Sequence, residues 1–347
     1  MQYWPIPVGR TSAMPHTQDG FIRLILVQPF VEHIEQRGFD PRPALATVGV
    51  SKKMLRDPSA TVHAEIVYGL CNTLAGLSEI SHLGCEVGQQ FDLATWPPIA
   101  ASAQATDRVD AFLYNYLMQV PQESSSVKHT LTVEAEHASY RVSRLVPTDN
   151  PPRQVDGFGI ALHLRLLKTA MGPAWMPQDV LVETGYPEAV PRGFMGVRLA
   201  RTETPSLTFS FPSDWLNAAL NLRAKVGAPS AEAAEPDMSI VAALRSAARP
   251  LLWKDKLTAQ DLAVALGLDQ RRLEAALKLH QTTPARELKR LKIEVAQQAL
   301  ADLSRSIAEI GQSLGYADQS HFARFFRSQT GLSPQAYRRS VKPRDGD

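Results

Sequence analysis

The feature that most constrains this chain runs from Ser306 to Arg327. Ser306 and Glu309 form a capping box at the start of a short helix, because each side chain can pair with a backbone N–H of the first turn. Gly315 supplies a turn conformation that is costly for other residues. Asp318 is a favourable N-cap for a second helix. The stretch therefore predicts a helix, a turn and a second helix.

The second of these helices has two different faces. Phe322 and Phe326, one helical turn apart, are predicted to bury one side. The opposite side presents small, amide-bearing and basic side chains, namely Gln319, Ser320, Ala323, Arg324 and Arg327. A helix that enters the major groove of DNA reads base edges with such side chains, and arginine also reaches phosphates. The pattern predicts a DNA-recognition helix.

A second copy of this pattern lies upstream, at residues 257–277. Thr258 caps its first helix and Gly267 makes the turn. Asp269 caps the next helix, whose inner side is formed by Leu273, Ala276 and Leu277. The two turn glycines, Gly267 and Gly315, are 48 residues apart. The chain therefore predicts two helix-turn-helix units in tandem.

A long helix is predicted between the two units. Thr283 is its cap, Pro284 occupies the tolerated first position, and apolar residues recur at helical spacing as far as Leu300. A helix of about 20 residues is about 30 Å long, close to one turn of duplex DNA at about 34 Å. Two recognition helices could then enter successive major grooves. A plain helical bundle would explain one such pattern more readily than two capped copies with this spacing.

The last hundred or so residues resemble the DNA-binding domain of AraC-type (AraC/XylS) bacterial transcription regulators. The similarity follows the family signature from Ile307 to Arg338. In that family, the face that here carries Gln319, Ser320, Ala323 and Arg324 contacts bases in the second major groove. The resemblance implies that the first recognition helix presents Gln270, Arg271, Glu274, Ala275 and Lys278. Ala275 stands where common members often carry arginine.

Helix N-termini supply a further expectation. Backbone N–H groups at the starts of helices bind phosphate, so the helices capped by Thr258, Thr283 and Ser306 are candidate phosphate contacts. Glu274 is a departure from this basic pattern, because its carboxylate could accept from a cytosine amino group but would repel a phosphate.

Length and charge predict two domains of different character. A chain of 347 residues is longer than a typical single domain. The residues from Met238 onward carry 18 Lys and Arg against 11 Asp and Glu, a balance of +7. The preceding residues carry 19 against 24, a balance of −5. A basic module joined to an acidic one is typical of a protein whose basic part binds nucleic acid.

Prolines and small polar residues mark the domain boundaries. Residues 1–20 are predicted as a flexible tail and 227–237 as a linker, which leaves an effector or dimerisation domain at 21–226 and a DNA-binding domain at 238–343. The elements predicted in the effector domain are helices at 21–37, 62–76, 79–90 and 107–119, strands at 128–134 and 139–145, a helix at 158–171, and strands at 180–183, 196–200 and 206–211. The predicted fold is an α+β domain followed by an all-α domain with two helix-turn-helix subdomains joined by a long helix.

The effector domain also resembles a known type. Its layout, and above all the segment from Pro205 to Leu216, is similar to the arabinose-binding-type effector domain of ornithine- and virulence-type regulators. The resemblance implies a ligand-sensing or dimer-forming role. The helix at 158–171, with Ala161, Leu164 and Met171, could pack against a partner subunit or equally against its own sheet.

Catalytic signatures are absent from the sequence, so no catalytic residue is assigned. The predicted hairpin carries His129, Glu134, Glu136 and His137, which suit either a metal or acid/base pair or, with better support, a solvated tip. His63 and His82 are isolated. Trp96, Tyr114 and Tyr116 fit a hydrophobic core better than a pocket, and no ligand-binding residue is named.

Two cysteines bear on an alternative. Cys71 and Cys85 lie on adjacent predicted helices and are expected to be core thiols in a reducing compartment, with no zinc site or cofactor. The alternative hypothesis is an enzymatic or thiol-reactive sensor module tethered to a DNA-targeting domain, which needs a reactive cysteine in a cationic or metal-bound setting. No such setting is visible around either residue.

The hypothesis is a transcription regulator, expected to be an activator, that acts as a homodimer on double-stranded promoter DNA. RNA polymerase is a further candidate partner, and the small-molecule effector is unknown. No run approaches about 18 apolar residues, and the first residues lack the basic start and apolar core of a secretion signal. A cytoplasmic location without a membrane contact is expected.

Overall fold

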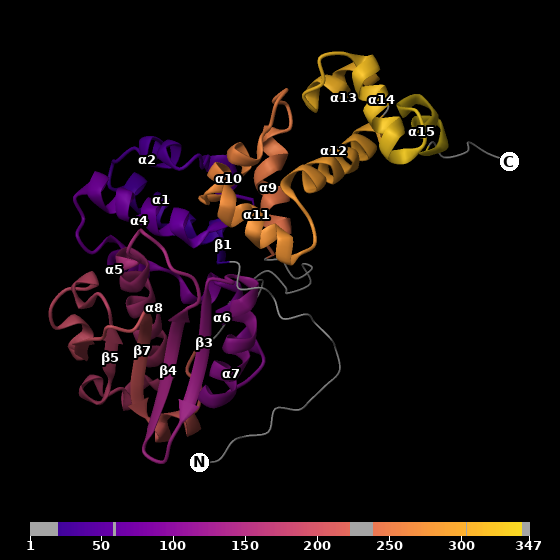
Figure 1. Ribbon diagram of the computed structural model, residues 1–347. Coiled ribbons are helices and arrows are strands. Elements are labelled where there is room, and N and C mark those ends of the chain that lie inside the picture. The colour runs from indigo at the N-terminus through magenta and orange to yellow at the C-terminus, as the bar shows by residue number, and fades with distance from the viewer. Residues whose placement is uncertain (1–19, 58–59, 223–238, 303, 342–347) are drawn as a thin grey trace. The chain divides into compact units, whose positions relative to one another are not determined.

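The computed structural model describes residues 20–57, 60–222, 239–302 and 304–341. The chain forms two compact units, Met1–Ser239 and Ile240–Asp347, whose elements are labelled in Figure 1. The predicted tail, apart from Gly20, and the predicted linker at 227–237 lie outside the described residues. The expected order of an α+β region followed by an all-α region is confirmed.

The first unit opens with a short two-stranded sheet rather than with the helix predicted at 21–37. Strand β1 (Phe21–Arg23) pairs antiparallel with β2 (Thr61–His63). Between them lie η1 (Leu24–Val27), α1 (Gln28–Gln36), α2 (Arg42–Thr47) and α3 (Lys52–Leu55). The helix predicted at 62–76 was wrong at its start for the same reason, because residues 61–63 belong to β2. Strands of three residues are too short to show an alternating pattern.

Two packed helices follow the small sheet. Helix α4 (Ala64–Ser78) ends at Glu79, whose left-handed backbone has φ of 54°. The next helix, α5 (Leu83–Gln90), therefore begins four residues later than the predicted start at 79. Helices α6 (Pro97–Gln104), which was not predicted, and α7 (Val109–Gln119) complete this helical part.

A five-stranded sheet forms the rest of the first unit, in the order β3-β4-β7-β5-β6. Its strands are antiparallel neighbours except for the parallel pair β5 and β6. Their bounds are β3 (Val127–Val133), β4 (His137–Arg144), β5 (Leu181–Thr184), β6 (Arg198–Arg201) and β7 (Ser206–Pro212). The strand predicted at 196–200 starts later because a turn of 3-10 helix occupies Phe194–Gly196.

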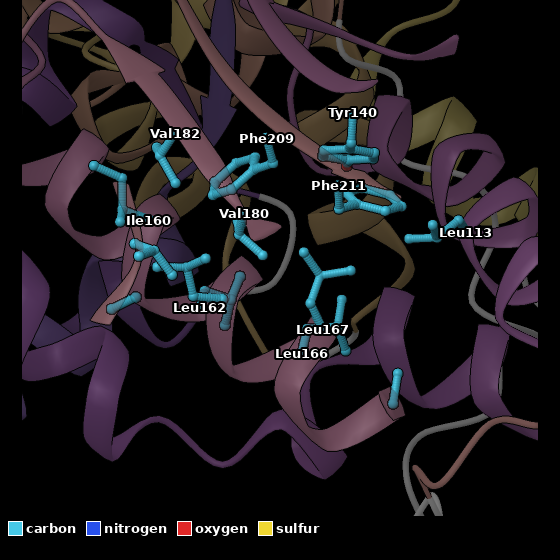
Figure 2. Packing of buried hydrophobic residues seen from close by; sticks show 14 of the residues in the cluster. Leu113, Tyr140, Ile160, Leu162, Leu166, Leu167, Val180, Val182, Phe209 and Phe211 are labelled. Atoms are coloured by element: carbon cyan, nitrogen blue, oxygen red, sulfur yellow. The ribbon is translucent and has the colours of Figure 1, made fainter. Parts of the chain in front are cut away.

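Helix α8 (Arg153–Met171) supplies the centre of the hydrophobic core. It starts five residues before the predicted position and packs tightly on α5, where a side chain at Gly84 would place its Cβ only 1.7 Å from the Gln154 carbonyl oxygen. Figure 2 shows side chains of α8 gathered with those of the sheet, among them Ile160, Leu166, Leu167, Val180, Phe209 and Phe211.

The burial of α8 decides whether this helix packs against a partner subunit or against its own sheet. Ala161 and Leu164 are fully buried and Met171 is 5% exposed, all within this core. These three side chains therefore pack inside their own unit and are not a surface for a partner subunit.

The second unit is entirely helical. Helix α9 packs against α10, α11 and α12, while α12 continues to contacts with α13 and α15, and α14 packs on both of these. The bounds are α9 (Ile240–Ala248), α10 (Ala259–Leu266), α11 (Gln270–Leu279), α12 (Pro284–Ala301), α13 (Ile307–Ser313), α14 (Gln319–Thr330) and α15 (Pro334–Val341). Helix α12 is thus shared by two small helical clusters, and its 18 residues span about 27 Å.

Candidate nucleic-acid interface and a cavity in the first unit

The capping box predicted at Ser306 and Glu309 is present, and the predicted cap Thr258 forms a second capping box with Asp261. Thr258 Oγ1 accepts from the backbone N–H of Asp261 at 3.1 Å, and the Thr258 N–H donates to the Asp261 carboxylate at 2.8 Å. Ser306 and Glu309 repeat this exchange at 3.1 and 2.7 Å. The hydrogen bonds hold the pKa of the Asp261 and Glu309 carboxyls below their ordinary values. The first helix of each helix-turn-helix unit therefore begins where the sequence predicts.

The turns and the second caps also form as predicted. Gly267 and Gly315 have φ of +70° and +78°, and a Cβ at Gly315 would lie 2.4 Å from the Lys254 carbonyl oxygen. Asp269 accepts from the N–H of Arg272 at 2.9 Å, and Asp318 accepts from that of His321 at 2.7 Å. Each turn is therefore followed by the predicted recognition helix, and the capping aspartate fixes the residue at which that helix begins.

Helix α14 has the two faces expected of it. Phe322 and Phe326 are fully buried and pack against Tyr316 and Tyr337, with ring centroids 5.6 and 5.5 Å apart. On the other side Gln319, Ser320, Arg324 and Arg327 are exposed and Ala323 is half-buried. In the part of the chain that the structure describes, no carboxylate pairs with Arg324 or Arg327. Both guanidinium groups are therefore available to an external anion or base.

The exposed face of helix α11 carries charges of both signs. Leu273 and Leu277 are buried, while Gln270, Arg271, Glu274 and Lys278 are exposed, together with Ala275. The Gln270 amide donates to the Glu274 carboxylate at 2.7 Å. This internal hydrogen bond and the negative charge of Glu274 distinguish α11 from α14, whose exposed face carries no acidic residue.

Helix α12 is held by charged side chains near its start and at its middle. Glu287, which is 1% exposed, accepts from Thr282 at 2.6 Å and from Arg290 at 2.8 Å. Next to the second helix-turn-helix unit, the Lys292 ammonium lies 4.8 Å from the centre of the Tyr316 ring. Arg290 and Lys292 therefore have structural partners.

The thiols occupy the core, as predicted. Cys71 on α4 and Cys85 on α5 are both free and 1% exposed. Burial raises the pKa of the Cys71 thiol and brings the pKa of the Cys85 thiol to about 12. A thiol-reactive sensor needs a lowered pKa, so neither cysteine suits that alternative.

The candidate residues of the hairpin separate in space. Glu134, Glu136 and His137 are exposed at the tip, but His129 lies on β3 beside Tyr140 and away from them. Grouping His129 with the tip was wrong. Within the described residues, no group of three or more His, Cys, Asp and Glu side chains could hold a metal ion. His63 is buried as the N-cap of α4, where it accepts from the Glu65 N–H at 3.2 Å.

A cavity lies inside the first unit, between the helical part and the sheet. It is lined by residues of β1, η1, α1, α4, α6, α7, β3, β4, α8 and β7, and by residues of the segment 120–126 that precedes β3. Of the three aromatic residues considered for a pocket, Trp96 and Tyr116 line it, whereas Tyr114 is 56% exposed on the surface of α7. The expectation that Trp96 and Tyr116 serve only as core was incomplete. His129 and His163, which sequence reasoning did not place in a pocket, also line it.

Two capped helix-turn-helix units on one shared helix, in a chain that also carries an α+β unit with an internal cavity, define a class of DNA-binding regulator with a sensing domain. The model of the arabinose-binding domain of AraC transcription regulators matches residues 38–220, and a helix-turn-helix domain model matches residues 262–340. The chain belongs to the AraC family of DNA-binding transcription regulators. None of the described helices is long and apolar enough to cross a membrane.

Curated relatives match a limited part of the chain. The MmsAB operon regulatory protein of Pseudomonas aeruginosa is 44% identical over 64 residues, which is 18% of this chain and 21% of the relative. The transcriptional activator NphR of Rhodococcus is 34% identical over 83 residues, 24% of this chain and 25% of the relative. The chain therefore spans about a quarter of the length of these relatives. The crystal structure of the regulator CdpR from Pseudomonas aeruginosa has a TM-score of 0.36 and 16% identity, over 91% of this chain and 98% of that one.

Proposed function

We propose that this chain regulates transcription by placing α14 and α11 in two successive major grooves of promoter DNA. The observation that carries the proposal is the exposed face of α14. There, two unpaired arginines and two polar side chains lie opposite the buried pair Phe322 and Phe326. An arginine without an internal ion pair can contact guanine or phosphate without first breaking a salt bridge.

Each side chain of α14 has a role that its chemistry suits. Gln319 and Arg324 can make paired hydrogen bonds to adenine and guanine, and Ser320 can bond to either. Ala323 offers a small apolar contact to a thymine methyl group. Arg327, one turn further along, is assigned to a phosphate.

Helix α11 is proposed to contribute less specificity. Arg271 and Lys278 are available for bases and phosphates, but the Gln270 amide must give up its hydrogen bond to Glu274 before it can read a base. If Glu274 instead accepts from a cytosine amino group, the released Gln270 amide gains a base partner of its own.

The three helix N-termini are not equal candidates for phosphate contact. The hydroxyls of Thr258, Thr283 and Ser306 all accept from their own first turns. At Thr258 and Ser306, the carboxylate of the capping box also occupies the N-terminus and would repel a phosphate. We assign the phosphate contact first to the N-terminus of α12, at Thr283, where no capping box forms.

The first unit is proposed as the effector and dimerisation domain, at 21–226, joined through 227–237 to a DNA-binding domain at 238–343. The homodimer would use surfaces other than the buried face of α8. Activation is part of the proposal and is supported by NphR, a relative named as a transcriptional activator. Contact with RNA polymerase and a cytoplasmic location complete the proposal. No catalytic role is proposed.

Selection of genomic fragments by the purified chain tests this function. We expect enrichment of fragments that share a motif with two parts about one helical turn apart, and binding that weakens steeply as salt rises, because phosphate contacts release counterions. Binding that ignores salt, or recovery of fragments without a common motif, would contradict the proposal. Sedimentation of the full chain tests the dimer, which a strictly monomeric protein at high concentration would exclude.

A further inference from the structure

The walls of the cavity in the first unit are mainly apolar. The space open to the centres of water-sized molecules is about 140 Å³, roughly ten times what a single water needs. Apolar side chains from separate elements form most of its surface, among them Leu26, Phe30, Val67, Phe158, Leu162 and Leu207. A space of this size and character suits an organic molecule rather than an ion.

Charged groups at the cavity are already paired with one another. Arg144 donates to the Asp156 carboxylate, which also accepts from Thr184 at 3.1 Å. The Glu123 carboxylate lies 2.6 Å from the Arg23 guanidinium, and both of these side chains are largely buried. The charged side chains at the cavity are therefore not free to pair with a charged ligand. Such a ligand would lose its hydration on entering the cavity without gaining an ion pair.

One buried histidine in the wall has a ring nitrogen that accepts no hydrogen bond from the described residues. His163, which is 7% exposed, has its Nδ1 at 2.7 Å from the Gly159 carbonyl oxygen. Because a carbonyl oxygen only accepts, Nδ1 must carry the proton of this hydrogen bond. Burial lowers the pKa of His163 to about 4, so the ring is neutral near pH 7. Nε2 is then a bare acceptor, and it has no hydrogen-bond partner among the described residues.

Two donors at the same cavity are also unfilled. The indole N–H of Trp96 and the Nε–H of Arg144 are buried without a hydrogen-bond partner in the described part of the chain. Buried polar groups are nearly always hydrogen-bonded in folded proteins, and an unpaired one costs free energy. Three unfilled groups on residues that line one cavity indicate partners supplied by a molecule inside it.

We infer that this cavity binds an uncharged, mainly apolar molecule with a hydroxyl or N–H group that donates to Nε2 of His163, while its aromatic or alicyclic body packs between Phe158, Trp96 and Tyr116. Oxygen acceptors on the same molecule would receive the Trp96 N–H. The further idea that this molecule is the effector of transcription rests on the proposed function. The binding of the molecule to the cavity is independent of the proposed function.

Three one-ring probes of closely similar shape test the inference on the full chain without DNA. Calorimetric titration at pH 7.5 compares 4-methylphenol, which carries the donor, with p-xylene, which lacks it, and with 4-methylbenzoate, which is an anion. We expect 4-methylphenol to bind at least about threefold more tightly than p-xylene, the factor that one modest hydrogen bond supplies. We expect no measurable binding of 4-methylbenzoate.

His163→Phe identifies the acceptor. This variant should bind p-xylene as before but lose the preference for 4-methylphenol. His137→Phe, the same change at the exposed hairpin tip, should keep it. If His163→Phe does not fold, the ranking of the three probes by the unaltered chain decides. The inference is overturned if no probe binds, so that the cavity holds water only, if 4-methylbenzoate binds most tightly, if p-xylene equals 4-methylphenol, or if the preference survives in a folded His163→Phe. Fragment selection on DNA is separate, so either idea can fail alone.

Discussion

The Glu287 carboxylate on α12 lies 3.4 Å from the Arg245 guanidinium on α9, buried at the point where the long helix joins the first helix-turn-helix unit. The contact is an ion pair rather than a well-formed hydrogen bond, because its geometry satisfies neither Arg245 Nε nor Glu287 Oε2. Arg290 and Thr282 complete the surroundings of the carboxylate. This network fixes the start of α12 against the first helix-turn-helix unit, as the proposed contact with two successive grooves requires.

Glu287→Ala should lower the free energy of unfolding of the second unit by about 2–4 kcal/mol, because it leaves a partly buried arginine without its counter-charge. The estimate is reduced from the fully buried case because Arg245 and Arg290 are 31% and 51% exposed. Glu294→Ala is the matched control on the same helix. Glu294 also pairs with Arg245, at 2.6 Å, but is 44% exposed, so its loss should cost about 0–1 kcal/mol. Equal losses in urea unfolding would refute the structural role of Glu287.

Arg324→Ala should weaken binding to the selected DNA motif by about 1–3 kcal/mol and relax the preference at one base position. Arg327→Ala, one turn further on, should weaken binding to all sequences alike and reduce the salt dependence. Competition binding on motif variants separates the two outcomes. A uniform loss in Arg324→Ala would reassign that residue to a phosphate.

Phe326→Ala should lower the free energy of unfolding by about 3–5 kcal/mol, because the ring is fully buried against Phe322 and Tyr337. The neighbouring exposed residue provides the control, since Arg327→Ala should leave the melting temperature nearly unchanged. A normal melting temperature for Phe326→Ala would mean that the inner and outer faces of α14 are assigned the wrong way round.

Acid should destabilise the first unit through its buried histidines. Burial lowers the pKa of His163 to about 4 and that of His129 to about 3, whereas an unfolded histidine titrates near 6.5. Below pH 6.5 the unfolded chain therefore binds more protons than the folded one, and stability falls as the pH drops from 6.5 towards 4. Urea unfolding at several pH values should show this slope, and His163→Phe should show a shallower one. A slope of opposite sign would mean that the rings are charged in the folded state.

Both thiols should resist alkylation in the native protein. Cys71 and Cys85 are buried, and their pKa values are raised by that burial, so almost no thiolate is present near neutral pH. Iodoacetamide at pH 7.5 should modify neither residue within hours but both after unfolding in urea. Rapid labelling of one native cysteine would revive the thiol-reactive sensor.

Local signals in the sequence predicted the second unit well. Ser306 and Glu309 determine their capping box within four residues, and Gly267 and Gly315 determine their turns through backbone conformation alone. Such features depend on neighbours in the chain, so they can be read without a structure.

Long-range contacts explain what was missed. Glu287 has the polarity of a solvated position on α12, and its ion pair with Arg245, which is distant in sequence, could not be predicted from its neighbours in the chain. The cavity draws its walls from many separate helices and strands, so no single segment of the sequence predicts it. One signal did exist in the sequence. His129 lies two residues from both Val127 and Leu131 along β3, and these two side chains pack against the core. That spacing places His129 on the inner face of the sheet and not at the hairpin tip.

Hydroxyl-radical footprinting of the full chain on a selected fragment tests the central claim most directly. Two recognition helices joined through α12 should protect two stretches of backbone on one face of the duplex, about 10–10.5 base pairs apart. Protection confined to a single groove, or no protected stretch at all, would contradict the account.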